Sequence, residues 1–225
     1  MKKERIFSPG SEIISIDMKT LQSDDLKHNQ SIKYILLDVH GVLTDGNERK
    51  RFLAKMEETY NIDYDQHNML WVSHLDELDR GKEKVSEYIR VVNKIFHTHF
   101  SPKEYYDLFL QQIVVNRALL RKLHTIKNKI YIVSDNVSGI SVGLNNVLGN
   151  DFRKYKKFYS CKLGVTKADG LLQIVVEKLK IKPEECLFID DNKTYTEAAK
   201  KKGIDTMLFR TNKALFSKLE TITFV

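Results

Sequence analysis

The stretch IKYILLDVHGVLTDG, residues 32–46, decides the fold. It runs through apolar residues, reaches one aspartate at Asp38 and breaks at Gly41. A short, continuous apolar run that ends in a polar residue is typical of a strand buried in a parallel sheet. The stretch therefore predicts a strand that delivers a carboxylate to a loop.

Two different patterns follow this strand along the chain, first helices alone and then strands that alternate with helices. Five helical patterns follow without a convincing strand between them, at 51–60, 68–78, 83–96, 101–113 and 116–126. The fourth opens with Ser101, Pro102 and Glu104, which fit an N-cap, a first-turn proline and a capping box. Strands then alternate with helices: strands at 129–135, 158–161, 186–191 and 206–209, helices at 137–148, 167–180, 194–203 and 212–220.

Strands that alternate with helices imply a parallel sheet with helices on both faces. We therefore expect an α/β fold with a doubly wound, Rossmann-like parallel sheet and an inserted helical unit. The expected divisions are an N-terminal arm over residues 1–31, a core over 32–47 and 127–225, and a helical insert over 48–126.

Composition limits the class of protein that this chain can be. The chain has 225 residues, a net charge of +7 and two cysteines, without metal-type cysteine spacing. No apolar run is long enough to span a bilayer, and the N-terminus does not read as a secretory signal. The basic clusters are scattered and no nucleic-acid motif accompanies them. We expect a cytoplasmic protein without nucleic-acid or membrane partners.

Chemically active residues stand at the ends of the predicted strands. Asp38 ends the first, Ser134 the second, and the pair Asp190–Asp191 the strand at 186–191, while Lys167 opens the helix at 167–180. Parallel strands bring these groups to one edge, where ligands bind. A carboxylate can attack phosphorus, other carboxylates hold Mg²⁺, and a lysine neutralises the transferring group. The set indicates phosphoryl transfer.

Four of these segments, in order, resemble the motifs of the haloacid dehalogenase-like hydrolase superfamily: LLDVHGVLTD, IVSDN, GVTKADG and FIDDNKTYTEAAKKKGI. The resemblance covers about residues 32–220 and implies that the helical insert is a cap over the active site. The insert also resembles, more loosely, the caps of the subgroup with glucose-1-phosphate phosphatases and the N-terminal phosphatase domain of soluble epoxide hydrolase.

The resemblance implies a role for each residue. Asp38 would be the nucleophile and a ligand of Mg²⁺. Ser134 and Lys167 would contact the phosphoryl group. Asp190 and Asp191 would hold the metal. The expected reaction is hydrolysis of a small phosphorylated metabolite through an aspartyl-phosphate on Asp38.

His40 departs from the family pattern, which usually has a second aspartate at this position as acid and base. Only the backbone carbonyl of that residue contacts the metal in the family, so the metal site should survive. Imidazole titrates near neutrality and can exchange protons. Three alternatives stay open: a phosphatase that uses His40, a different reaction, or a binding protein with weak or no turnover. The acidic pair disfavours a dehalogenase.

Overall fold

Five parallel strands form one sheet in the computed structural model, which describes residues 32–222. The strands are β1 (Tyr34–Leu37), β2 (Lys129–Ser134), β3 (Lys156–Tyr159), β4 (Cys186–Asp190) and β5 (Asp205–Leu208). Their order across the sheet is β3-β2-β1-β4-β5, with every neighbouring pair parallel. The predicted arm over residues 1–31 lies outside the described residues.

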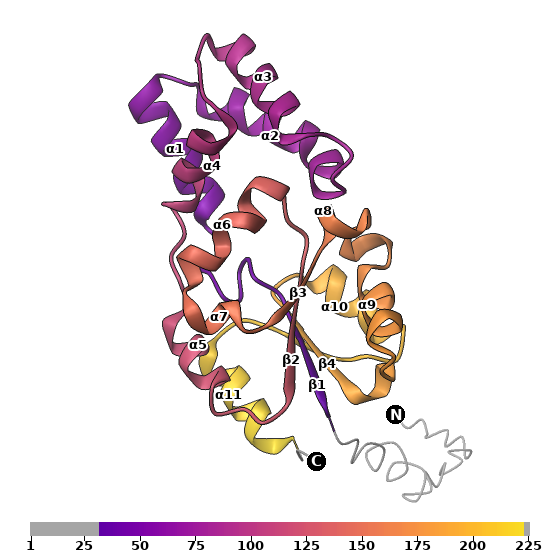
Figure 1. Cartoon of the computed structure of the whole chain (residues 1–225). Coiled ribbons are helices and arrows are strands. Elements are labelled where there is room, and N and C mark those ends of the chain that lie inside the picture. The colour runs from indigo at the N-terminus through magenta and orange to yellow at the C-terminus, as the bar shows by residue number, and fades with distance from the viewer. Residues whose placement is uncertain (1–31, 223–225) are drawn as a thin grey trace, which may run out of the picture.

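Helices cover both faces of the sheet, as Figure 1 shows. Ile35 and Leu37 of β1 join one apolar cluster and Leu36 joins the other, because successive side chains of a strand point to opposite faces. The first face packs against α5 (Arg117–Leu123), α6 (Ser138–Leu148), α7 (Asn150–Arg153) and α11 (Asn212–Thr221), and the second against α9 (Leu171–Leu179) and α10 (Lys193–Lys200). The predicted doubly wound α/β fold is confirmed.

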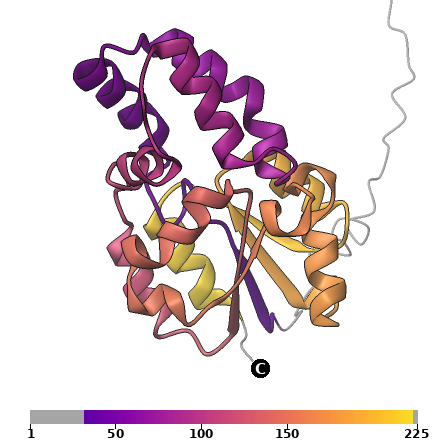
Figure 2. The same ribbon diagram turned by 45° about the horizontal axis from the view of Figure 1, so that its top comes forward.

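The inserted helices gather beyond the carboxyl end of the sheet (Figures 1 and 2). They are α1 (Glu48–Tyr60), α2 (Tyr64–Asp79), α3 (Val85–Phe96) and α4 (Pro102–Leu110), with the capping box of Ser101 and Glu104 in place. Their centre is aromatic: Trp71 is buried and stacks on Phe109 at a centroid distance of 5.5 Å. Across residues 32–222, no helix is long and apolar enough to cross a membrane.

We propose that the helix at 117–123, α5, belongs with the core rather than with the other inserted helices. It packs beside α11, and Asn116 at its N-cap exchanges two 2.9 Å hydrogen bonds with the amide of Asn212. The segment that leads from β1 into α1 and the segment that leads from α4 to α5 lie side by side. They are joined by an antiparallel bridge between Thr44 and Val115. We therefore take α1–α4 as the cap and end it before Asn116, instead of at residue 126.

Two local predictions differ from the structure. The helix expected over 167–180 is divided: Lys167–Asp169 forms a 3₁₀ turn, Gly170 adopts a φ of +116°, and α9 begins at Leu171. The strand expected over 158–161 ends at Tyr159, and a short helix α8 (Ser160–Leu163) follows. Both turns bend the chain close to the sheet edge, where local propensity is overridden by tertiary contacts.

The cap approaches the core through glycines. A Cβ on Gly139 would lie 2.5 Å from the Tyr106 ring, so α4 packs tightly against α6. Gly81, with a φ of +66°, brings the end of the α2 segment against the carbonyl oxygen of Cys161. Arg80 pairs with Asp169 across the same junction. The cap therefore rests on the core at two places, around α6 and around α8.

A buried histidine couples the stability of the cap to pH. His67 is fully buried, with Nε2 2.6 Å from the hydroxyl of Tyr105, and burial lowers the pKa of His67 to about 4. The unfolded chain binds this proton near pH 6.5, so acid favours the unfolded state between pH 6.5 and 4.

We expect His67 alone to remove about 2 kcal/mol from the free energy of unfolding between pH 7 and pH 5. Urea titrations at the two pH values measure this loss, and the loss should be smaller by that amount in His67→Phe. His99→Gln, a change at an exposed histidine, is the control. An equal acid loss in wild type and His67→Phe would contradict the expectation.

Candidate active site

All six residues singled out from the sequence line one cavity of about 220 Å³ at the carboxyl edge of the sheet. These residues are Asp38, His40, Ser134, Lys167, Asp190 and Asp191. Asp38 follows β1 directly, Ser134 ends β2 and Asp190 ends β4. Residues of β1 pair in parallel with both β2 and β4, so these three strand ends are neighbours.

Lys167 holds the carboxylates together. Its Nζ lies 2.9 Å from Oδ2 of Asp38 and 2.6 Å from Oδ2 of Asp190, and all three residues are buried. Burial would lower the pKa of Lys167, but the carboxylates of Asp38 and Asp190 outweigh burial and raise it. The ammonium group therefore stays charged and balances part of the negative charge at the strand ends.

Three carboxylates are close enough to share a cation. One oxygen each of Asp38, Asp190 and Asp191 lies within 4.8 Å of the other two. Oδ1 of Asp38 is buried and has no hydrogen-bond partner within residues 32–222. Burial, and then the charge of Asp38, raise the pKa of both Asp190 and Asp191, so one lysine leaves negative charge uncompensated. A cluster of carboxylate oxygens with uncompensated negative charge fits Mg²⁺, which prefers oxygen ligands.

Gly41 is required where the loop after β1 passes the acidic pair. Its φ is +76°, a conformation that side chains disfavour. A Cβ at this position would also lie 2.1 Å from Oδ2 of Asp191. The glycine therefore lets the backbone turn directly against the carboxylate.

The loop after β2 orients the groups around Lys167. Asp135 accepts a 2.8 Å hydrogen bond from the backbone N–H of Lys167, which anchors the 3₁₀ turn. The Ser134 hydroxyl donates to the carbonyl of Asp135 at 3.2 Å. The Tyr195 ring covers Lys167, with Nζ 4.7 Å from its centroid. Asp135 and Tyr195 were not among the sequence candidates, although Asp135 adjoins Ser134.

His40 is held between the cap and the core. Its Nδ1 contacts Oε1 of Glu48, the first residue of α1, and its Nε2 lies 3.1 Å from the amide nitrogen of Asn136. Burial would lower the pKa of His40, but the hydrogen bond and charge of Glu48 raise it. The contact with Glu48 was not predicted, because no sequence pattern relates a histidine in a loop to an acidic residue at the start of the next helix.

A second cavity, of about 240 Å³, lies on the cap side of His40. It shares His40 and Asp135 with the first cavity and is closed by Trp71, Leu75 and Asp79 of α2. Burial, and then the charge of Asp135, raise the pKa of Asp79 to about 7. The two cavities meet at His40, so a molecule held in one can extend into the other.

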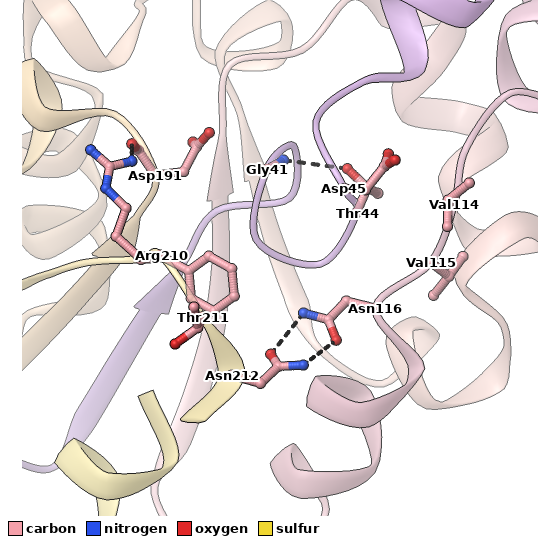
Figure 3. Close-up of a pocket in the computed structure, with 11 residues that line it drawn as sticks. Gly41, Thr44, Asp45, Val114, Val115, Asn116, Asp191, Arg210, Thr211 and Asn212 are labelled. Atoms are coloured by element: carbon pink, nitrogen blue, oxygen red, sulfur yellow. Dashed lines mark hydrogen bonds between the residues drawn. The ribbon is translucent and has the colours of Figure 1, made fainter. Parts of the chain in front are cut away.

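A third cavity, of about 480 Å³, borders the site away from Lys167, and Figure 3 shows its lining. Gly41 and Asp191 form its boundary with the first cavity. Arg210 reaches the carbonyl of Asp191 at 3.1 Å, and the paired amides of Asn116 and Asn212 join the linker to α11. This cavity links the loop after β5 to the chain that enters and leaves the cap.

The comparison with family models decides the relationship. The model of the haloacid dehalogenase-like hydrolases matches residues 32–203. The chain belongs to the haloacid dehalogenase-like hydrolase family. The match includes Asp38, Ser134, Lys167 and the acidic pair, and spans the cap as well as most of the core.

Individual relatives agree with this assignment. Bifunctional epoxide hydrolase 2 of Sus scrofa is 28% identical over 135 residues, which are 56% of this chain and 24% of the relative. The match thus spans about a quarter of that curated relative.

Solved structures share the fold. A predicted family hydrolase from Porphyromonas gingivalis superposes with a TM-score of 0.68 at 17% identity, covering 86% of this chain and 100% of its own. An aspartate-to-alanine variant of a family enzyme from Bacteroides thetaiotaomicron, in complex with magnesium and inorganic phosphate, gives 0.66 at 19% identity, covering 82% and 99%.

The carboxylate cluster predicts that Mg²⁺ stabilises the folded protein. A ligand that binds only the native state at 100 times its dissociation constant adds about 2.7 kcal/mol. Thermal unfolding of wild type should therefore shift upward with added MgCl₂, and the shift should shrink strongly in Asp191→Asn. Asp205→Asn, at the start of β5, is the matched control. Equal shifts in the two variants would contradict a site at Asp191.

Proposed function

We propose that this hydrolase is a Mg²⁺-dependent phosphatase that acts on a small phosphorylated metabolite through an aspartyl-phosphate on Asp38. The observation that carries the proposal is the arrangement at Asp38. Among residues 32–222, one oxygen is held by Lys167 and the other is buried without a partner, in a cavity lined by three further carboxylates. A carboxylate so placed can attack phosphorus, with a cation beside it to neutralise the approaching anion.

The proposed reaction has two steps. An oxygen of Asp38 forms a bond to phosphorus while the bond between phosphorus and the ester oxygen breaks, and the departing alcohol takes a proton from His40. Water then attacks phosphorus, the bond to Asp38 breaks, and His40 takes the proton that the water loses. The products are the alcohol and inorganic phosphate, and the protein returns to its starting state.

In this proposal Asp38, Asp190 and Asp191, with the backbone carbonyl of His40, hold Mg²⁺. The metal would supply positive charge for the phosphoryl oxygens. Lys167 would supply a second positive charge, and Ser134 a hydroxyl that donates to a phosphoryl oxygen. Such groups stabilise the charge that develops on the phosphoryl oxygens only if their positions are fixed beforehand. The contacts of Lys167 with Asp38, Asp190 and Asp135 support that requirement.

His40 takes the place of the acid–base aspartate in this proposal. Glu48 occupies Nδ1, which leaves Nε2 as the nitrogen that exchanges a proton. Glu48 also raises the pKa of His40, so the acid form persists to higher pH than in free imidazole. When Nε2 carries a proton, the amide of Asn136 can turn so that Oδ1, which has no partner among residues 32–222, accepts a hydrogen bond from Nε2–H.

The cap favours a small substrate. The cavity on its side of His40 holds about 240 Å³ and is lined by α1, α2 and α4 of the cap and by residues of the core. A phosphomonoester with its phosphate among the carboxylates and Lys167 would place its alcohol in this space. Closure of the cap would exclude bulk water from the reacting group. A cavity of this size suits a small molecule better than a folded phosphoprotein.

The first experiment is phosphate release from an aryl phosphate with and without Mg²⁺. We expect turnover in wild type, no turnover without Mg²⁺, and loss of at least about 10³-fold in Asp38→Asn, because the amide is not a nucleophile. His40→Asp, which installs the usual family residue, should stay active. A silent wild type beside an active His40→Asp would show that the site binds phosphate and that the histidine stops turnover.

A second experiment isolates the acid role of His40 and its dependence on Glu48. Aryl alcohols leave readily as anions, whereas alkyl alcohols need a proton from the acid. Glu48→Gln should therefore lower kcat for an alkyl phosphate about 10-fold and leave an aryl phosphate nearly unchanged. The variant should also lose alkyl turnover at lower pH than wild type, because the pKa of His40 falls. Equal losses with both esters would argue against the acid role.

A further inference from the structure

The cavity on the cap side of His40 contains acceptor oxygens that no donor satisfies. Oε2 of Glu48 and Oδ1 of Asn136 are buried and belong to residues that line the cavity, and neither oxygen has a hydrogen-bond partner in the part of the chain that the structure describes. Both residues are more than nine-tenths buried. Oδ1 of Asn136 can turn to Nε2 of His40, whereas Oε2 of Glu48 is left as a buried acceptor to which a bound molecule can supply a donor.

Asp79 adds a third acceptor from the cap. It is the last residue of α2 and faces the cavity with Asp135, which comes from the core. Within residues 32–222 the Asp79 carboxyl has no ion pair. The neighbouring Arg80 is turned away, towards Asp76 and Asp169. The negative charge of an ionised Asp79 can therefore interact with a molecule bound in the cavity.

The other residues that line the cavity indicate the chemical character of the rest of a bound molecule. Five apolar side chains form most of the wall: Trp71, Leu75, Phe109, Val137 and Ile140. Arg49, the one arginine or lysine in the lining, is an exposed residue at the rim. A short carbon chain fits the apolar wall, and a positively charged donor at its far end fits the acidic side.

We propose that the alcohol released from the substrate is a small amino alcohol, whose ammonium group binds between Asp79 and Asp135 while its carbon chain lies against the wall formed by Leu75 and Phe109. The inference rests on the proposed phosphatase activity and names the chemical class of its substrate. Its physical basis is that the carboxyl groups of Asp79 and Asp135 line the same cavity, where an ammonium group can bind to both. The raised pKa of Asp79, caused first by burial and then by the charge of Asp135, is consistent with this arrangement.

The test compares three esters of similar size: 3-aminopropyl, 3-hydroxypropyl and butyl phosphate. Wild type with Mg²⁺ at pH 8 should turn over the aminopropyl ester with a kcat/KM at least about 10-fold above the other two. Asp79→Asn should remove this preference, and a circular dichroism spectrum that matches wild type shows that the variant is folded. Asp65→Asn, the same change at the exposed start of α2, should keep the preference.

The outcomes separate the two proposals. Absence of phosphate release from the aryl ester and from all three alkyl esters would overturn the phosphatase, and the substrate class with it. Release without preference for the amine, a preference for the hydroxyl ester, or a preference that survives Asp79→Asn would overturn the substrate class alone.

Discussion

One buried ammonium group makes the rest of the site possible. Asp38, Asp190 and Asp191 come from two neighbouring strands whose parallel pairing forces their ends together. Buried carboxylates at such separation repel one another strongly, because little water screens them. Lys167 lies within 2.9 Å of two of the three and is itself anchored through its backbone N–H to Asp135. The positive charge of Lys167 therefore offsets part of the repulsion among the carboxylates at this edge.

The cap depends on the same edge through His40. The loop that carries Asp38 continues within two residues to His40, and Glu48 of the first cap helix contacts the ring. The linkers that lead into and out of the cap are paired with each other at Thr44 and Val115. The orientation of the imidazole is therefore linked to the position of the cap.

Much of the fold was predictable because the sequence signals were local and repeated. The apolar run before Asp38 and the alternation after Lys129 gave the sheet, and Ser101 with Glu104 gave the start of α4. The predicted strand ends, the helix that Lys167 opens and the family resemblance at His40 together gave the six residues that meet in one cavity. Glu48, Asp79 and Asn136 were missed as partners of the site, since their roles come from cap packing across long separations in the chain. The extent of the cap was likewise hidden, because α5 has the same helical pattern whether it packs on the cap or on α11.

The most direct test of the account is to trap the intermediate on Asp38. Wild type would be mixed with a radiolabelled phosphomonoester and Mg²⁺, quenched in acid during turnover, digested and mapped by peptide. The account predicts label on the peptide that carries Asp38, dependent on Mg²⁺ and absent from Asp38→Asn. Steady phosphate release with no label on that peptide, or label on another residue, would contradict it.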